Sequence, residues 1–234
     1  MVENPILRER ARMQLGNQIF SNPWLLMLVV CLIVDAIMNA ATAATSGVAA
    51  FIVGGPLTYG LCYVTLSCAR GWEWKIEHVF CGFAKRFGDS LVLYLLQNLF
   101  IALWTLLFVI PGLVKSYSYA LAFYIASDNP EMSANDCITE SRKMMDGHKW
   151  QLFCLDFSFI GWYLLGALCF GIGTLFVVPY HQVERANFYA ELKMEKDFDK
   201  AKQVAGNNQG GYENNNANNN INNSANNNND EVFF

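Results

Sequence analysis

The feature that most constrains this chain is a series of apolar runs of about 20 residues, with a basic segment after every second run. About 20 apolar residues in a helix are enough to cross roughly 30 Å of hydrocarbon. The runs cover residues 23–43, 47–68, 89–110, 111–126, 150–170 and 172–189. Only 15% of the residues are charged, whereas a soluble domain has about a quarter. The sequence therefore predicts an all-α polytopic membrane protein with six transmembrane helices.

Proline-containing stretches indicate that the predicted spans pair as hairpins. LWTLLFVIPGLVKSYSYALAFYIA, at 103–126, is apolar up to Pro111-Gly112 and then apolar again. Similar stretches surround Pro56 and Pro179. We interpret the chain as three repeated units, each an amphipathic helix followed by an outward and an inward span. The units cover 4–68, 69–127 and 128–192, and their turns fall near 44–47, 110–112 and 171–174.

Each unit is predicted to begin with an amphipathic helix that lies in the membrane interface. In the first helix, Asn4 caps the start and Leu7, Ala11 and Leu15 share one face. The second helix, within 69–88, carries Trp72, Ile76, Val79, Phe80 and Phe83 at helical spacing. In the third, Ser133 and Asp136 form a cap, Cys137, Ile138, Ser141, Met144 and Met145 share a face, and Gly147 ends the helix.

Aromatic and basic residues near the span ends are candidates for interface anchors. These anchors are Trp24, Trp72, Trp74, Lys149 and Trp150. Small residues at i+4 spacing, Ala36 and Ala40 in one span and Ser118 and Ala122 in another, favour close helix packing or association with a second copy.

The basic residues gather on one side of this arrangement. Of the 16 Lys and Arg residues, all except Lys115 and Arg185 lie on the side opposite the three hairpin turns. The positive-inside rule therefore predicts a multi-pass protein of the cell membrane with both termini in the cytoplasm.

The C-terminal part of the chain has a different composition. Residues 193–205 are charged and favour a cytoplasmic helix. Residues 206–234 are dominated by asparagine and offer almost no apolar surface to bury, so we expect a disordered tail. The membrane domain is accordingly predicted to cover 1–192. Its seven cysteines form no CxxC motif, and we interpret them as reduced apolar residues.

Charged residues within spans are candidates for function. These candidates are Asp35, Lys115, Asp156, His181, Glu184 and Arg185. At about 1.5 Å per residue, Asp156 and Arg185 each lie roughly 10 Å from the cytoplasmic side, which predicts that they pair. Asp35 has no predicted partner, and Lys115 is predicted near the outer surface. These groups either line a path for ions, protons or a small solute, or form structural ion pairs.

The sequence gives little support for an enzyme. It contains no GxSxG, HExxH or P-loop motif, and no catalytic residue is predicted. His181 and Glu184 share a helix face, but His78 and His148 lie outside the predicted spans, so we expect no metal site. We expect no cofactor. The net charge of −4 gives no indication of nucleic-acid binding.

Three long segments resemble a bacterial membrane family catalogued as domain of unknown function 975. They are PGLVKSYSYALAFYIASDNP at 111–130, ITESRKMMDGHKWQLFCLDFSFIGW at 138–162 and VVPYHQVERANFYAEL at 177–192. RERARMQLGN resembles the opening of the family, and the resemblance covers roughly 5–192. It implies a multi-span membrane protein with no assigned activity or catalytic residue.

These observations lead to two main functional hypotheses. The first is a non-enzymatic membrane scaffold or binding protein, whose cytoplasmic-leaflet helices contact the lipid bilayer, an unidentified protein or a second copy. The alternative is a small transporter or channel with a polar path through the bundle. An enzyme acting on lipid is the third hypothesis.

Overall fold

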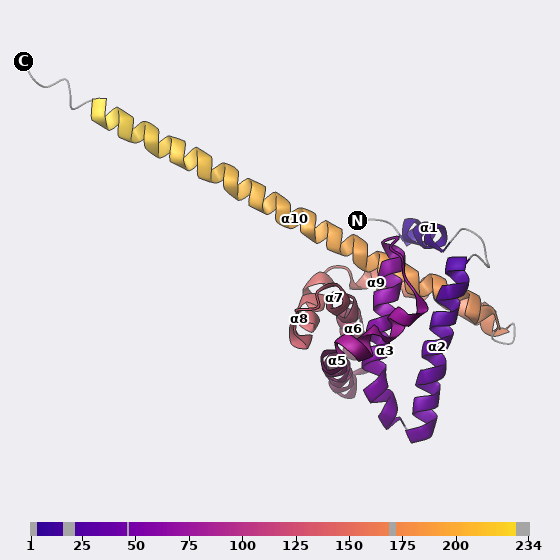
Figure 1. Cartoon of the computed structure of the whole chain (residues 1–234). Helices are drawn as coiled ribbons and strands as arrows, with labels where there is room; N and C mark the ends of the chain where they lie inside the picture. The colour runs from indigo at the N-terminus through magenta and orange to yellow at the C-terminus, as the bar shows by residue number, and fades with distance from the viewer. Residues whose placement is uncertain (1–3, 16–21, 46, 169–171, 228–234) are drawn as a thin grey trace, which may run out of the picture. The chain divides into compact units, whose positions relative to one another are not determined.

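The computed structural model describes residues 4–15, 22–45, 47–168 and 172–227, and these residues contain helices and connecting turns only (Figure 1). The helices are α1 (Asn4–Gln14), α2 (Asn22–Thr45), α3 (Val48–Ala69), the 3-10 helix η1 (Ile76–Phe80), α4 (Cys81–Lys85), α5 (Phe87–Leu107), α6 (Val109–Tyr119), α7 (Ala122–Asp128), α8 (Ala134–Met144), α9 (Lys149–Leu168) and α10 (Ile172–Asn227). The chain divides into two compact units, Met1–Leu192 and Lys193–Phe234.

Five segments within the described residues are long and apolar enough to cross a membrane. They are Asn22–Ala43, Val48–Ala69, Phe87–Leu107, Val109–Asp128 and Lys149–Leu168. The predicted sixth span, 172–189, forms the start of α10 and is not among them. It contains Glu184, Arg185 and several other polar residues, which lower its hydropathy. The fold is therefore that of a polytopic membrane protein with five clear candidate spans.

Helices α2 and α3 form the first hairpin (Figure 1). Gly47, in the turn between them, has a φ of 97°, a left-handed conformation that favours glycine. Trp24, predicted as an interface anchor, is instead fully buried and stacks on Phe176 with ring centroids 5.4 Å apart. Its ring fills the interior because apolar neighbours from other helices cover the start of α2.

The second hairpin, α5 and α6, turns earlier than the sequence predicts. Phe108 has extended backbone angles and separates the two helices, whereas Pro111 lies in the first turn of α6, where its missing N–H is tolerated. Gly112 packs closely against Thr105 of α5. The fourth predicted span is also two helices, since the chain breaks at residues 120–121 between α6 and α7.

The third hairpin brings α9 against α10. Gly166 and Gly173 lie in direct contact, and a side chain on either would meet the backbone of the other helix. The predicted turn at 171–174 falls partly outside the described residues, because 169–171 are not described.

The predicted amphipathic helix within 69–88 is wrong as a single helix. The structure has a turn after α3, then η1, then the short α4, with a non-helical residue at Arg86 before α5 begins. Close backbone contacts explain this path, since Gly60 of α3 packs against the carbonyl of Val79, and Gly82 packs against that of Pro56. A single regular helix over this segment could not make both of these backbone contacts.

Helices α1 and α8 have the predicted faces, but each face packs against protein. Leu7 and Ala11 of α1, and Leu15 directly after it, are at most 1% exposed and join the two apolar cores. The predicted face of α8, Cys137, Ile138, Ser141, Met144 and Met145, is buried as well. Ser133 caps α8 by accepting a hydrogen bond from the Asp136 N–H, and Gly147 follows with a φ of 81°. These caps confirm the predicted boundaries of α8.

Helix α10 continues to Asn227 and so includes most of the asparagine-rich segment that composition predicts to be disordered. Within the second unit, the ammonium group of Lys202 lies 4.5 Å from the centroid of the Phe198 ring. Asparagine and glycine are weak helix formers. The residues of this part of α10 therefore stabilise a helix only weakly.

Candidate functional site

Four of the six predicted polar candidates lie where α1, α9 and α10 meet. Asp156 of α9 lies at the centre, with its carboxylate 2.9 Å from His181 Nε2 and 3.5 Å from an Arg185 terminal nitrogen. The predicted pairing of Asp156 with Arg185 is confirmed. His181 joins the pair because it lies one helical turn before Arg185, on the same side of α10.

A hydrogen-bonded chain extends from Asp156 through His181 to Tyr163. His181 Nδ1 lies 3.0 Å from the Tyr163 hydroxyl, and its ring packs on Phe159 at 4.7 Å between centroids. Tyr163 lies seven residues after Asp156 on α9, so both residues project toward the same side of that helix. The chain fixes the orientation of the imidazole ring between α9 and α10.

Glu184 faces α1 instead of α9. Its side chain is 1% exposed, and Oε1 lies 3.4 Å from Arg8 Nε. Among the described residues, neither oxygen of the Glu184 carboxylate has a hydrogen-bond partner, and Arg8 supplies the compensating charge. The guanidinium of Arg8 also lies 5.5 Å from the centroid of the Phe159 ring. Arg8 of α1 therefore contacts both Glu184 of α10 and Phe159 of α9.

Two further polar contacts hold α1 to α10. Arg10 forms an ion pair with Glu191. Gln14 and Asn187 exchange amide hydrogen bonds of 3.0 and 2.8 Å, and Gln14 also donates to the carbonyl of Ala69 at 2.6 Å. Asn187 is buried. Helix α1 is thus fastened to the bundle by side-chain contacts as well as by its apolar face.

Sequence reasoning missed Arg8, Arg10, Gln14 and Asn187. The available signal was the spacing of Glu184, Asn187 and Glu191, which places polar groups on one face of α10. That pattern required a polar partner, and α1 supplies it.

The remaining two candidates lie apart from this cluster. Asp35 is exposed on α2. Lys115 of α6 is half-buried, with its ammonium group 4.8 Å from the centroid of the Trp104 ring. That Lys115 lies near the outer surface stays a prediction.

A second polar cluster joins the ends of α3 and α7 to Tyr189 of α10. The Arg70 guanidinium donates to both carboxylate oxygens of Asp128, at 2.5 and 2.8 Å, and the Tyr189 hydroxyl donates to Asp128 at 3.0 Å. The hydrogen bond to Asp128 raises the pKa of Arg70 above its ordinary value. Arg70 also lies 5.1 Å from the centroid of the Trp72 ring.

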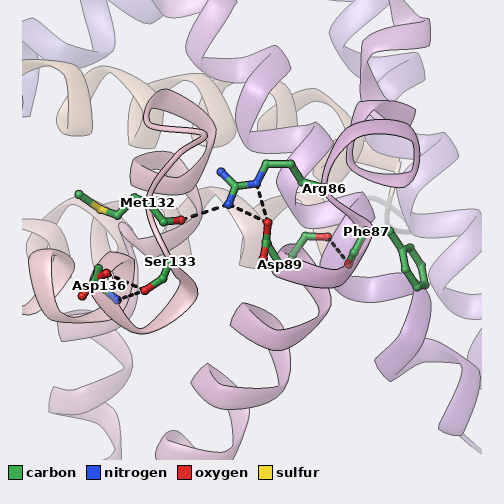
Figure 2. Close-up of polar contacts among 7 residues, drawn as sticks. Arg86, Phe87, Asp89, Met132, Ser133 and Asp136 are labelled. Atoms are coloured by element: carbon green, nitrogen blue, oxygen red, sulfur yellow. Dashed lines mark hydrogen bonds and ion pairs between the residues drawn. The ribbon is translucent and has the colours of Figure 1, made fainter.

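A third cluster surrounds Arg86, where α5 begins (Figure 2). Arg86 donates to Asp89 at 2.9 and 3.1 Å and to the carbonyl of Met132 at 3.1 Å, which ties α5 to the loop before α8. A pocket of about 10 Å³ lies beside it, large enough for about one water molecule. This cluster holds α5 and the loop before α8 together.

The predicted interface anchors have different surroundings. Trp72 and Trp150 are 58% and 73% exposed, as an anchor requires, whereas Trp74 and Lys149 are half-buried. Trp24 is buried, as described above. Within the described ranges, no three His, Cys, Asp or Glu side chains are grouped to hold a metal ion.

The helices and their paired charges define a polytopic α-helical membrane protein. A family model described as "Protein of unknown function (DUF975)" matches residues 1–123 and 106–196. The chain therefore belongs to the DUF975 family, in agreement with the resemblance of its motifs. No curated protein and no solved structure matches the chain.

Proposed function

We propose that this chain is a non-enzymatic membrane scaffold or binding protein. The observation that carries the proposal is that charges of its apolar helices pair with one another, Asp156 with Arg185 and Glu184 with Arg8. Ion pairs that join α1, α9 and α10 are typical of a structural role, since each buried charge has a compensating charge. The clusters around Arg70 and Arg86 connect helices in the same way.

Two surfaces support contact with lipid and with a partner. Phe80, Phe83 and Phe87 are exposed in a row, with ring centroids 6.2–6.3 Å apart, and suit an apolar environment such as lipid chains. The outer face of α8 is polar and exposed, and suits a protein partner. A second copy of the chain would use the small exposed residues of α2, Ala36 and Ala40.

We also propose six spans, with the start of α10 as the sixth and both termini in the cytoplasm. The basic side of the chain holds fourteen of the sixteen Lys and Arg residues. Single cysteines at 45 and 173, compared with 78 and 140 in a background lacking the native cysteines, test this topology. An impermeant reagent should label only the first two in intact cells, and the reverse pattern would contradict the proposal.

A transporter or channel is the second candidate function. The chain of titratable side chains from Tyr163 through His181 to Asp156 favours it, because such chains can pass protons. The two functions differ in the expected effect of neutral substitutions. A structural cluster loses stability, whereas a proton path loses flux while the protein stays folded.

Proton flux in proteoliposomes separates these functions. Liposomes with and without the purified protein would carry a pH dye inside, and a pH gradient would be imposed. The scaffold proposal predicts equal rates of gradient loss with and without protein. A rate that is raised by the native protein and lost in a folded His181→Asn variant would overturn the scaffold and support the transporter. An Asn98→Ala variant, altered outside the cluster, is the matched control.

A further inference from the structure

We propose that two copies of this chain associate through α2, with Asp35 of each copy accepting a hydrogen bond from Asn39 of the partner subunit. Because both copies use the same two residues, the contact occurs twice in a symmetric dimer. The inference deepens the second-copy contact of the proposed scaffold function and rests on it. It assigns a role to Asp35, which lies apart from the polar clusters described above.

Helix α2 has one face on protein and the opposite face exposed. Its inward residues are buried or half-buried against an apolar core, and they are Met27, Val30, Cys31, Val34, Ile37 and Met38. The outward residues recur every three or four positions and are exposed, and they are Leu32, Asp35, Ala36, Asn39, Ala40 and Ala43. This outward face belongs to the candidate span Asn22–Ala43. In a membrane it faces either lipid or another helix.

Two polar side chains on this outward face are unsuited to lipid. Asp35 lies eight residues before the end of the span, about 12 Å into it at 1.5 Å per residue, and Asn39 lies one turn further along. Among the described residues, neither side chain has a hydrogen bond or an ion pair. Ionisable side chains within spans almost always face protein or water, because hydrocarbon cannot solvate them. Asp35 and Asn39 therefore indicate that another helix covers this face.

The chemistry of the pair favours a second copy as that helix. An ionised Asp35 can only accept hydrogen bonds, whereas the Asn39 amide donates them, so the face is complementary to itself. A second copy crosses the membrane in the same orientation and has the same two groups at the same depth. A two-fold axis can then pair each acceptor with a donor. A different protein would need a matching donor at this one depth.

The neighbours of the pair permit the close approach that it requires. Ala36, Ala40 and Ala43 surround Asp35 and Asn39, and small residues let the backbones of two membrane helices come near enough for short polar side chains to meet. Other spans expose large apolar side chains instead, such as Leu99 and Leu103 of α5, which are 62% and 61% exposed. Those side chains suit lipid, so the outward face of α2 is the one fitted to a helix.

Förster energy transfer between full chains in liposomes tests the proposal. Chains labelled at the N-terminus with a donor or an acceptor dye would be reconstituted together over a range of protein-to-lipid ratios. We expect transfer above that of random proximity, which gives a dissociation constant for the dimer. Asp35→Ala and Asn39→Ala each remove both symmetric hydrogen bonds and should each weaken association about tenfold.

An exchange variant separates the pairing from general damage. Asp35→Asn/Asn39→Asp rebuilds the same pair with its roles reversed, so association should return to within about threefold of the native value. This recovery would also show that α2 tolerates changes at both positions. Ala36→Leu adds bulk to the outward face and should weaken association about tenfold. Leu99→Ala on α5 is the matched control and should leave it within about twofold.

Three results would overturn the proposal. Native transfer no greater than random proximity would exclude the second copy as the occupant of this face. Single variants that associate as tightly as the native chain would exclude Asp35 and Asn39 from the contact. Failure of the exchange variant to recover would exclude their pairing. The proton-flux experiment tests the scaffold separately, since a monomeric chain can still serve as a scaffold.

Discussion

Arg70 binds both carboxylate oxygens of Asp128 and so joins the end of α3 to the end of α7. The pair is largely buried, with side chains 21% and 10% exposed, and Tyr189 adds a third hydrogen bond from α10. Three helices that are distant in sequence therefore meet at one carboxylate. Like the cluster at Asp156, this junction uses polar groups to fix how apolar helices pack.

Asp128→Asn should lower the free energy of unfolding by about 3 kcal/mol, because it leaves a buried guanidinium without its counter-charge. Chemical unfolding of the purified protein in detergent measures the change. Glu140→Gln is the control, since its carboxylate pairs with Lys143, whose side chain is 67% exposed. That control should cost at most about 1 kcal/mol. Equal losses in the two variants would contradict the importance of the Asp128 junction.

Gly60→Ala should destabilise the protein by about 3 kcal/mol or more, since an added methyl group would overlap the carbonyl oxygen of Val79. Thermal unfolding in detergent reports the loss. Gly161→Ala in α9 is the control, because its added methyl group meets nothing within 4 Å and alanine favours a helix. A Gly60→Ala protein as stable as the native one would show that η1 does not pack on α3.

Cys137 should resist alkylation even in alkaline buffer, because burial raises the pKa of its thiol to about 11 from an ordinary value of 9.0. The folded state disfavours the thiolate, so this group supports folding below pH 9 and its contribution falls as pH rises above that value. At pH 9, iodoacetamide should modify a sole Cys137 about fiftyfold more slowly than a sole cysteine at the exposed position 139. Comparable rates would contradict the packing of α8.

The part of α10 beyond residue 206 should exchange its amide hydrogens much faster than residues 180–190. Asparagine and glycine stabilise a helix poorly, and this part has few apolar side chains to bury. Hydrogen exchange followed by mass spectrometry compares the two segments directly. Equal protection would contradict the expectation and would indicate a partner for the tail.

The sequence predicted those features that depend on spacing along one helix. The buried faces of α1 and α8, the Ser133 cap and the Asp156–Arg185 pair all follow from helical periodicity and depth. The sequence did not predict whether protein or lipid covers an apolar helix face. An apolar helix face that lies on protein has the same pattern as one that lies on lipid, so the contact of Arg8 with Glu184 was missed.

Errors also arose where a span was assumed to be one straight helix. The sequence predicts the second hairpin turn at 110–112, but the structure has it at Phe108, and the predicted fourth span is broken after Tyr119. The segment after α3 failed for a related reason, since contacts of Gly60 and Gly82 with the backbone override its helical periodicity. Such long-range contacts leave no periodic signal in the sequence.

The most direct test of the structural role of the charges is a double-mutant cycle on Asp156 and Arg185. Asp156→Asn, Arg185→Gln and the double variant would be compared with the native protein by their free energies of unfolding in detergent. The pairing predicts that the double variant loses less than the sum of the single losses, by about 1–3 kcal/mol. Additive losses, or single variants as stable as the native protein, would contradict the claim that this pair holds α9 to α10.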